Sequence, residues 1–422
     1  MKKRILSALM AAVMCLAAVG CGGNKPEGQT GETESVQRES VSEKKIGMIL
    51  VGDENEGYTY AHIEGMRTAE VQNGLNDDNI IWKYSVPEDE SCKEAAVDLV
   101  EQGCVAIFSN SYGHQTFMEE AAAEYPDVQF VSMTGDRAAL SGLPNFSNAF
   151  TNVYESRFVS GVVAGMKVKE LVEAGKLSAE NMDGNKVKIG YVGAYPYAEV
   201  VSGYTAFFLG IQYIYPDVTM EVRYTNSWFD ITAEAEAANA LMADGCVIIG
   251  QHADSTGAPT AVQDANDKGK PVYSVGYNVD MLSVAPHAAL TSATNVWSVY
   301  YNEAVKTILE GGKIPTDWSK GYADGAVAIT KLGPDVAEGT SDKVDEVISA
   351  IKNGELKVFD AGSFTVGGKH LDSYHVDMNG NFSNEDPEDK EAIWDGYFHE
   401  SELRSAPSFD IRIDGITELT AE

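Results

Sequence analysis

Basic residues are scarce in this sequence. Lysine and arginine together number 31 against 64 aspartates and glutamates, which gives a formal net charge of −33. Proteins that bind nucleic acid neutralise phosphates with clustered lysines and arginines, so we expect no nucleic-acid partner. The acidity itself needs no specific role, because a hydrated, soluble surface accounts for it.

Cysteines are also few, and they form no pattern of a disulfide framework or a metal site. Besides Cys15 and Cys21 near the N-terminus, the chain has Cys92, Cys104 and Cys246. Cys92 and Cys104 bracket a predicted helix whose ends stand about 17 Å apart, beyond the reach of a disulfide. Because no CxxC or Cys/His spacing is present, we expect buried, unreactive thiols, with no metal and no cofactor.

Catalytic motifs are absent as well. The sequence contains no GxSxG, HExxH or P-loop pattern, and no GxGxxG follows a predicted strand. Acidic residues such as Asp324 and Asp335 have no base or nucleophile beside them. We therefore do not expect an enzyme.

The N-terminus has the pattern of an export signal. Residues 1–20, MKKRILSALMAAVMCLAAVG, place three basic residues ahead of an apolar stretch. This stretch is shorter than the roughly 20 residues that a membrane-spanning helix needs. The segment LAAVGCGG resembles a bacterial lipoprotein cleavage site, at which Cys21 becomes lipidated and acyl chains such as palmitate anchor the protein. An ordinary secretory signal with a chance cysteine is the alternative.

Residues 21–44 are rich in Gly, Ser, Glu and Gln, and they contain too few apolar side chains to form a core. We expect a flexible tether there, with the folded part beginning near Lys45. The whole chain of 422 residues is 44% hydrophobic and 23% charged, which suffices for two domains with a core each.

The folded part contains an internal repeat. TNVYESRF begins at Thr151 and TNVWSVYY at Thr294, while KIGMILVG begins at Lys45 and KIGYVGA at Lys188. Both pairs are separated by 143 positions (151 to 294 and 45 to 188). The sequence therefore predicts two halves with the same architecture.

Within each half, short apolar runs alternate with amphipathic helical patterns. This alternation predicts crossover connections and a parallel sheet with helices on both faces, so the expected fold is α/β with two similar lobes. The predicted strands lie near 46–51, 79–84, 104–108 and 128–132 in the first half, and near 187–192, 219–225, 246–250 and 271–275 in the second.

The expected domain limits follow from this repeat. Lobe 1 comprises residues 45–150 and about 276–310, lobe 2 comprises 151–275 and about 311–366, and an acidic C-terminal extension occupies 367–422. The extension contains DMNGNFSNEDPED, in which the glycine is misplaced for an EF-hand loop. We expect an acidic surface hairpin or lid there, with a calcium site as the weaker alternative.

Ligands of open α/β sheets bind beyond the carboxyl ends of the strands, so the loops at those ends supply the candidate binding residues. These loops offer aromatic rings with amide, hydroxyl and carboxylate groups but hardly a Lys or Arg, which favours a planar, uncharged small molecule in a cleft between the lobes. The candidates are Tyr58, Tyr60, Asn110, Ser111, Asn152, Trp228, Asp254, Tyr277, Asn278, Asp280, Asn295 and Trp297.

Structural roles remain open for several candidates. Asn152, Asn295 and Asp254 are also suited to capping the helices that follow them. Trp228 and Trp297, like the first-loop tyrosines, are also suited to core positions near helix ends.

Longer segments resemble a known family. KIGMILVGDENEGYTYAHIEGMR, NAFTNVYESRFVSGVVAGM, KIGYVGAYPYAEVVSGYTAFFLG and LTSATNVWSVYYNEAVKTIL are similar to the basic membrane protein family of ABC-transporter solute-binding lipoproteins, from about Lys45 to about Ser363. The resemblance implies a type I periplasmic-binding fold. It also implies a purine nucleoside or purine base as ligand, and it places the stacking aromatic residue at Tyr58.

This chain departs from the family pattern at three places. Glu54 and Asn55 stand where nucleoside-binding members have two aspartates, and Asn278 replaces an aspartate, with Asp280 nearby. The TSATNVW segment lacks the basic residue that often follows the family's TS turn. The choice between purine base and purine nucleoside therefore stays open.

The resemblance further implies partners and a location. We expect a monomer, anchored through Cys21 to the outer face of the cell membrane, which delivers its ligand to an ABC permease and its ATPase. The alternatives are a binding protein for another small polar solute such as a sugar, or a ligand-sensing partner of a membrane receptor.

Overall fold

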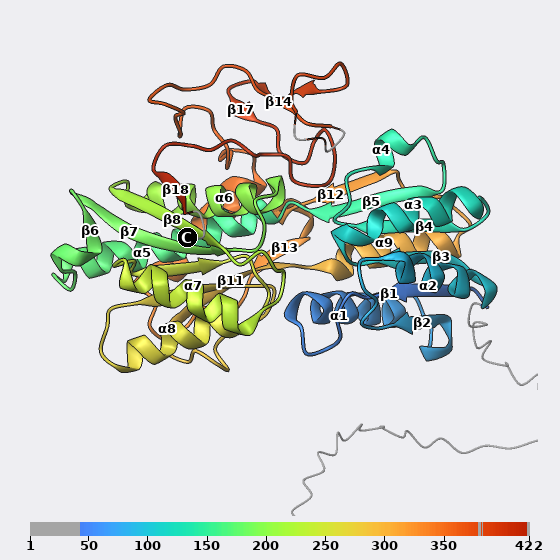
Figure 1. The fold of residues 1–422 in the computed structure, drawn as a ribbon, viewed down its shortest axis with the longest axis horizontal. Helices are drawn as coiled ribbons and strands as arrows, with labels where there is room; N and C mark the ends of the chain where they lie inside the picture. Colours follow the sequence, from blue (N-terminus) through green and yellow to red (C-terminus); the bar gives the residue numbers. More distant parts are fainter. Residues whose placement is uncertain (1–42, 379–380, 382, 420–422) are drawn as a thin grey trace, which may run out of the picture. The chain divides into compact units, whose positions relative to one another are not determined.

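The computed structural model describes residues 43–378, 381 and 383–419 (Figure 1). The expected export signal, the lipidation site at Cys21 and all but the last two residues of the expected tether lie outside this part of the chain. No helix within it is both long enough and apolar enough to cross a bilayer.

The first sheet has six parallel strands in the order β12-β5-β4-β3-β1-β2. They are β1 (Lys45–Ile49), β2 (Ile80–Lys83), β3 (Cys104–Ser109), β4 (Gln129–Met133), β5 (Phe146–Thr151) and β12 (Asp317–Lys320). Their apolar runs are buried because helices cover both faces. One face carries α1 (Gly57–Gln72) and α9 (Trp297–Leu309), and the other carries α2 (Glu90–Glu101) and α3 (Gln115–Glu124).

The second sheet follows the order β13-β11-β10-β9-β7-β8-β18, with β6 paired to β7. Its strands are β6 (Met182–Asp183), β7 (Lys186–Gly193), β8 (Val218–Tyr224), β9 (Ile248–Gln251), β10 (Tyr273–Tyr277), β11 (Ala289–Asn295), β13 (Val327–Ile329) and β18 (Ile416–Leu419). Only β6 and β13 pair antiparallel. One face carries α5 (Val153–Glu173) and α6 (Ala198–Ile214), and the other carries α7 (Ile231–Ala243) and α8 (Gly257–Asp267).

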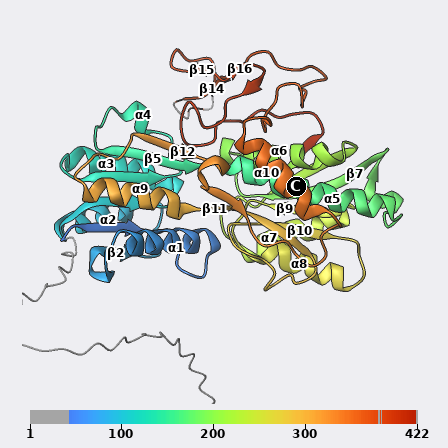
Figure 2. The same cartoon turned by 180° about the vertical axis from the view of Figure 1, so that it is seen from behind.

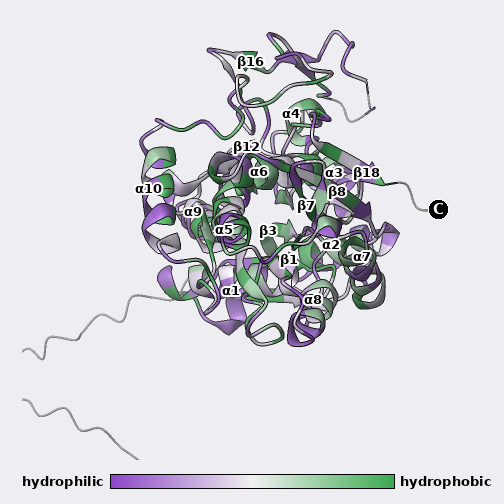
Figure 3. Cartoon of the chain, turned by 90° about the vertical axis from the view of Figure 1, so that its left-hand side faces the viewer, coloured by the Kyte–Doolittle hydropathy of each residue, from purple (hydrophilic) through white to green (hydrophobic). Residues whose placement is uncertain are grey.

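These two layered units confirm the expected α/β class with two similar lobes. Each of the eight expected strands is present, with ends within a few residues of the predicted ones. In Figure 3 the hydrophobic colour gathers in the inner strands and helices, and the hydrophilic colour lies on outer turns such as those of α10 (Thr340–Lys352). Cys92, Cys104 and Cys246 are free and buried, as predicted.

The repeated TNV segments mark places where the chain passes from one sheet to the other. The first begins at Thr151, the last residue of β5, and leads into α5, and the second includes the last two residues of β11 and leads into α9. The Thr151 hydroxyl donates a hydrogen bond to the Asn295 side-chain oxygen, so the two passages touch each other. A third passage joins β12 to β13. The two copies of the TNV segment therefore form two of the connections between the sheets.

Two expected domain limits differ from the sheet membership. Residues 289–295 were expected in lobe 1, but β11 pairs in parallel with β10, which keeps the chain in the second sheet until the second TNV segment. Residues 317–320 were expected in lobe 2, but β12 pairs with β5 at the edge of the first sheet. In both cases backbone pairing determines the sheet to which the segment belongs. The spacing between repeated segments does not reveal which strands pair.

The C-terminal extension packs against the second sheet as well as forming the expected surface hairpins. Short antiparallel ladders join β14 (His375–Val376) to β15 (Lys390–Glu391) and β16 (Ile393–Trp394) to β17 (Tyr397–Phe398). After them, β18 adds to the sheet edge beside β8, in parallel. The side chains of Phe398, Phe409 and Ile411 join the apolar core of the second sheet. Figure 2 shows this segment from behind, above the layered units.

A buried carboxylate fixes the extension to α6. Glu400 is 3% exposed and accepts hydrogen bonds from the Ser202 hydroxyl at 2.7 Å and from the backbone N–H of Ser408 and of Phe409. Burial raises the pKa of Glu400 to about 7, although these hydrogen bonds oppose the shift. The ionised form is therefore costly at this position.

We expect Phe409→Ala to lower the free energy of unfolding by about 3–5 kcal/mol, since a large core aromatic is lost. Phe409 is fully buried and stacks on Phe359 with ring centroids 4.2 Å apart. Urea denaturation measures the change, with Leu140→Ala as a control, because Leu140 is 49% exposed. Equal losses for the two variants would contradict the core role of the extension.

Glu400 also predicts a pH dependence of stability. Because its pKa is raised in the folded protein, the fold favours the protonated form. Stability from this group is therefore complete below the unfolded pKa and is lost as the pH rises through about 7. Between pH 4.5 and 8 we expect the wild type to lose stability relative to Glu400→Gln by an amount on the order of 3 kcal/mol. If the free energies of unfolding of the wild type and Glu400→Gln differ by the same amount at every pH in this range, the ionisation of Glu400 does not affect stability.

Candidate ligand-binding site

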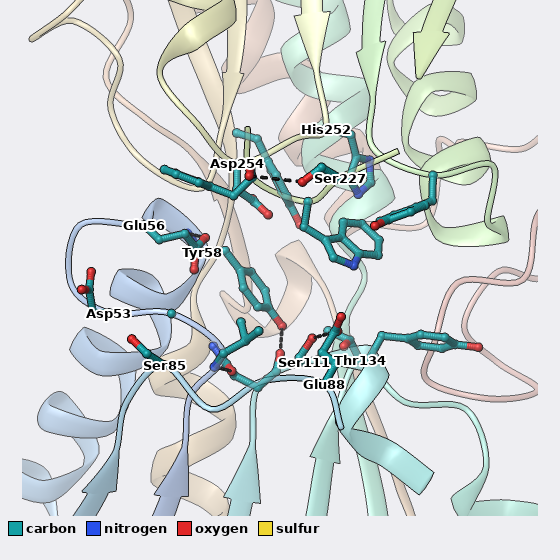
Figure 4. A pocket seen from close by; sticks show the side chains of 18 of the residues that line it. Asp53, Glu56, Tyr58, Ser85, Glu88, Ser111, Thr134, Ser227, His252 and Asp254 are labelled. Atoms are coloured by element: carbon teal, nitrogen blue, oxygen red, sulfur yellow. Dashed lines mark hydrogen bonds between the residues drawn. The ribbon is translucent and has the colours of Figure 1, made fainter. Parts of the chain in front are cut away.

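A cavity of about 450 Å³ lies where the carboxyl ends of strands from both sheets meet (Figure 4). The loops of the first sheet contribute Val51, Gly52, Asp53, Asn55, Glu56, Tyr58, Ser85, Glu88, Asn110, Ser111, Tyr112 and Thr134. The loops of the second sheet contribute Tyr195, Glu199, Ser227, Trp228, Phe229, His252, Asp254 and Tyr277. Both repeats therefore supply the wall of one cavity.

Half of the candidates named from the sequence line this cavity. They are Tyr58, Asn110, Ser111, Trp228, Asp254 and Tyr277. They come from separate loops along the chain, and the parallel arrangement of both sheets brings those loops together.

Three other candidates lie directly behind the wall. Asn278 donates its amide hydrogen to Asp254 at 2.8 Å, and Asn295 donates to the Tyr277 hydroxyl at 3.2 Å. Trp297 is 1% exposed, because it belongs to the core beneath α1. These side chains support the wall and do not line the cavity.

The remaining three candidates lie elsewhere. Tyr60 is 42% exposed and, together with Asp280, lines a separate hollow between α1 and the loop after β10. Asp280 accepts a hydrogen bond from the backbone N–H of Leu282 and so caps a turn. Asn152 accepts a hydrogen bond from Ser319 of β12, at the passage between the sheets.

Tyr58 is held in place from several directions. Glu56 caps α1 by accepting hydrogen bonds from the backbone N–H of Tyr58 and Thr59, at 2.8 and 2.9 Å. The Tyr58 hydroxyl donates to the backbone oxygen of Asn110, and its ring meets the edge of His62 at 4.6 Å. Figure 4 shows the Tyr58 side chain projecting into the cavity. A ligand therefore meets a ring with little freedom to move.

His62 connects Tyr58 to the core. Its ring stacks on Trp297 with centroids 4.4 Å apart, and its Nδ1 lies 2.7 Å from the Tyr301 hydroxyl. Burial lowers the pKa of His62 well below its usual value, so the imidazole is neutral. This histidine supports the wall and contributes no charge to the site.

A row of aromatic rings follows one side of the cavity. Tyr112 of the first sheet's loops lies 5.9 Å from Tyr197 between ring centroids, and Tyr197 stacks on Tyr195 at 5.2 Å. Tyr195 meets the edge of Trp228 at 5.1 Å. The row thus begins on a loop of the first sheet and ends on a loop of the second.

Five carboxylates also line the cavity, and no Lys or Arg does so among the residues that the structure describes. They are Asp53, Glu56, Glu88, Glu199 and Asp254. Hydrogen bonds within the described part of the chain reach only one oxygen of Glu88, of Glu199 and of Asp254. The wall therefore presents hydrogen-bond acceptors to a ligand.

Burial and mutual repulsion act on these carboxylates. Burial raises the pKa of Asp254 well above its usual value, and the negative charges of Glu56, Glu234 and Glu199 raise it further. Burial likewise raises the pKa of Glu56. An additional negative charge in the cavity would therefore be strongly disfavoured.

One buried cation lies behind the wall. Arg157 of α5 is 1% exposed, and its guanidinium carbon lies 3.6 Å from the centroid of the Tyr277 ring. Burial, followed by the positive charge of Arg157, lowers the pKa of His252 to about 4. His252 is therefore neutral at pH 7 and pairs with Glu199 at 3.2 Å.

Of the five acidic residues of the wall, the sequence interpretation named only Asp254. Glu56 and Glu199 are separated by the same 143 positions as the repeated segments, and both stand at the start of a helix that follows a strand. The internal repeat therefore contained the signal for this pair. Glu88 and Tyr195 have no such partner, and only the fold brings them to the cavity.

Comparison with known proteins agrees with this architecture. The family described as ABC transporter substrate-binding protein, PnrA-like, matches residues 43–361. A purine-binding protein of Brucella abortus is 31% identical over 319 residues, which cover 75% of this chain and 83% of that protein. A putative ABC transporter glucose-binding protein of Haloferax volcanii is 29% identical over 344 residues, or 81% of this chain and 78% of the relative.

Solved structures share the fold at lower identity. An ABC transporter solute-binding protein from Aeropyrum pernix aligns with a TM-score of 0.62 at 17% identity, over 78% of this chain and 94% of that chain. A solute-binding protein from Conexibacter woesei aligns with a TM-score of 0.57 at 18% identity, over 74% of this chain and 98% of that chain. The repeated α/β architecture, the cavity between the sheets and the family match lead to one conclusion: the chain belongs to the PnrA-like family of ABC transporter substrate-binding proteins.

Proposed function

We propose that this extracytoplasmic substrate-binding protein captures a purine nucleoside or a purine base and delivers it to an ABC permease. The observation that carries the proposal is the Tyr58 ring, which is fixed at the cavity and surrounded by carboxylate acceptors. A purine offers a flat face to an aromatic ring and N–H donors to carboxylates. The 31% identical purine-binding relative supports the same ligand class.

The charges of the wall select against nucleotides. Phosphate groups are bound by backbone N–H cradles, lysines or arginines. The N–H groups at the start of α1 already serve Glu56, and Asp254 and Glu199 face the cavity from the second sheet. A nucleoside or a base avoids the repulsion that a phosphate would meet.

A sugar is the second candidate ligand. Carboxylates and aromatic rings also suit a sugar, because hydroxyl groups donate to carboxylates and the apolar sugar face packs on rings. The Haloferax volcanii relative, named as a putative glucose-binding protein, favours keeping this candidate. The two ligand classes differ in the need for a stacking ring.

We also propose that the protein is anchored to the membrane by a lipid. Lipidation at Cys21 would hold the protein at the outer face of the membrane, and residues 21–44 would let the folded part reach its permease. Both features rest on the sequence, because they precede the described residues except for 43 and 44.

A thermal-shift panel tests the ligand class. We expect guanosine, adenosine or hypoxanthine to raise the melting temperature, since a ligand at 100 times its Kd adds about 2.7 kcal/mol of stability. Guanosine monophosphate is the matched anionic control, and we expect it to have no effect. A shift with glucose alone would reject the purine proposal.

The stacking role of Tyr58 has its own test. We expect Tyr58→Ala to weaken binding of the purine selected by the panel at least tenfold, or about 1.4 kcal/mol, and Tyr58→Phe to retain most of the affinity. Isothermal titration calorimetry measures both. Tyr60→Ala is the control, because Tyr60 lies two residues along the same helix but outside the cavity.

If Tyr58→Ala and Tyr60→Ala both retain wild-type affinity, Tyr58 does not stack on the ligand. Trp228→Ala then becomes the decisive variant, since Trp228 also lines the cavity. A folded Tyr58→Ala protein, verified by its denaturation curve, keeps the comparison valid.

A further inference from the structure

The C-terminal extension, defined as residues 367–422, follows the part of the chain that the family matches, residues 43–361. It is nevertheless bound to both sheets. β18 extends the second sheet, and Glu400 binds α6. Figures 1 and 2 show the described part of the extension passing above α6 and reaching towards β12 and α4 (Ala138–Ser141).

Two neighbouring residues of the extension contact the first sheet. The Arg404 guanidinium lies 3.7 Å from a carboxylate oxygen of Asp136, in the loop after β4. The backbone N–H of Ser405 donates to Asp317, at the start of β12, at 2.8 Å. The side chains of Arg404 and Asp136 are 7% and 11% exposed, so little water screens the pair.

The contact made by Arg404 continues to the ligand cavity. The Tyr112 hydroxyl donates at 3.2 Å to the same Asp136 oxygen that faces Arg404. Tyr112 lines the cavity and begins the aromatic row that leads through Tyr197 to Tyr195. A chain of direct contacts therefore joins the extension to the cavity wall.

We propose that Arg404 is a positioning residue for the ligand site: it holds Asp136, and through Asp136 it fixes Tyr112 against the aromatic row. The C-terminal extension is then part of the binding unit. The proposal rests on the proposed function, because it takes this cavity as the place where the ligand binds.

The positive charge of Arg404 acts on two acidic residues, Asp136 and Asp317. Burial raises the pKa of Asp317, the hydrogen bonds from Ser405 lower it, the charge of Arg404 lowers it further, and the negative charge of Asp136 raises it. Arg404 therefore lies close to two carboxylates that repel each other. It also donates to the backbone oxygen of Asp377 at 2.8 Å, which orients the guanidinium. Without the cation, the Asp136 carboxylate would lose its charge partner at 11% exposure, so we expect the loop that carries Asp136 to be less firmly held.

A purely structural role of Arg404 predicts a different outcome. In that case its loss would lower stability but would act independently of Tyr112. If Arg404 acts through the Tyr112 hydroxyl, removing that hydroxyl first should abolish most of the effect on binding. A double-mutant cycle separates the two cases.

The experiment compares Arg404→Gln, Tyr112→Phe and the double variant by calorimetric titration with guanosine, hypoxanthine and glucose as separate probes. For the probe that the wild type binds, we expect Arg404→Gln to lower the affinity about fivefold and to add less than about twofold in the Tyr112→Phe background. Arg404→Lys should restore part of the loss. Arg412→Gln is the control, because Arg412 lies on the same extension and pairs with Glu418 at the surface.

Hydrogen exchange without ligand gives a second measurement. We expect Arg404→Gln, and not Arg412→Gln, to speed amide exchange in residues 110–115 and 134–142. Unchanged exchange there, unchanged affinity, or equal losses of affinity in both backgrounds would overturn the positioning role. A wild type that binds glucose and neither purine would instead reject the purine proposal and leave the test of Arg404 intact.

Discussion

Parallel strand pairing determines where this chain can hold a ligand. In each sheet the carboxyl ends of the parallel strands reach the same edge, so the loops that follow them gather there. The TNV segments carry the chain between the sheets, and the Thr151–Asn295 hydrogen bond joins two of these passages. As a result, one cavity is lined by residues as far apart in sequence as Val51 and Tyr277, 226 positions (51 to 277). Helix capping, ring packing and charge placement all refine a site whose location the sheets have already fixed.

The helices α1 and α6 both begin at the cavity, and each has a glutamate at or near its N-terminus. An exposed helix N-terminus attracts anions, since its first N–H groups lack partners within the helix. Here Glu56 satisfies those groups in α1, and Glu199 occupies the first turn of α6. At α1 a protein carboxylate thus takes the place that a phosphate would otherwise use, and at α6 Glu199 adds a negative charge near the helix start. The neutral His252 belongs to a wall that is rich in acceptors and rings, and the buried Arg157 lies behind that wall against Tyr277.

Sequence periodicity was a reliable guide to the elements, because buried parallel strands and amphipathic helices leave strong local patterns. It predicted the strands of both halves and the loops that carry Tyr58, Asn110 and Asp254. It could not predict that β12 returns to the first sheet, since edge pairing depends on backbone contacts with distant strands.

The same limit applies to the site. The sequence places Asn278 and Trp297 beside strand ends, but the depth of a side chain depends on what packs over it. Both turned out to support the wall from behind. The packing of the extension against the second sheet could not be predicted for another reason: its short strands carry little periodicity, and contacts with α6 and β8 hold the segment in place.

Long-range strand pairing has a consequence for how the chain folds during its synthesis. β12 pairs with β5, and β18 pairs with β8, so each sheet is completed by residues made long after its central strands. A chain that is synthesised N-terminus first therefore leaves the edge of β5 unpaired until β12 is made and the edge of β8 unpaired until β18 is made. Unpaired strand edges tend to pair with other chains, so a fragment that ends before β18 is expected to aggregate more readily than the full chain.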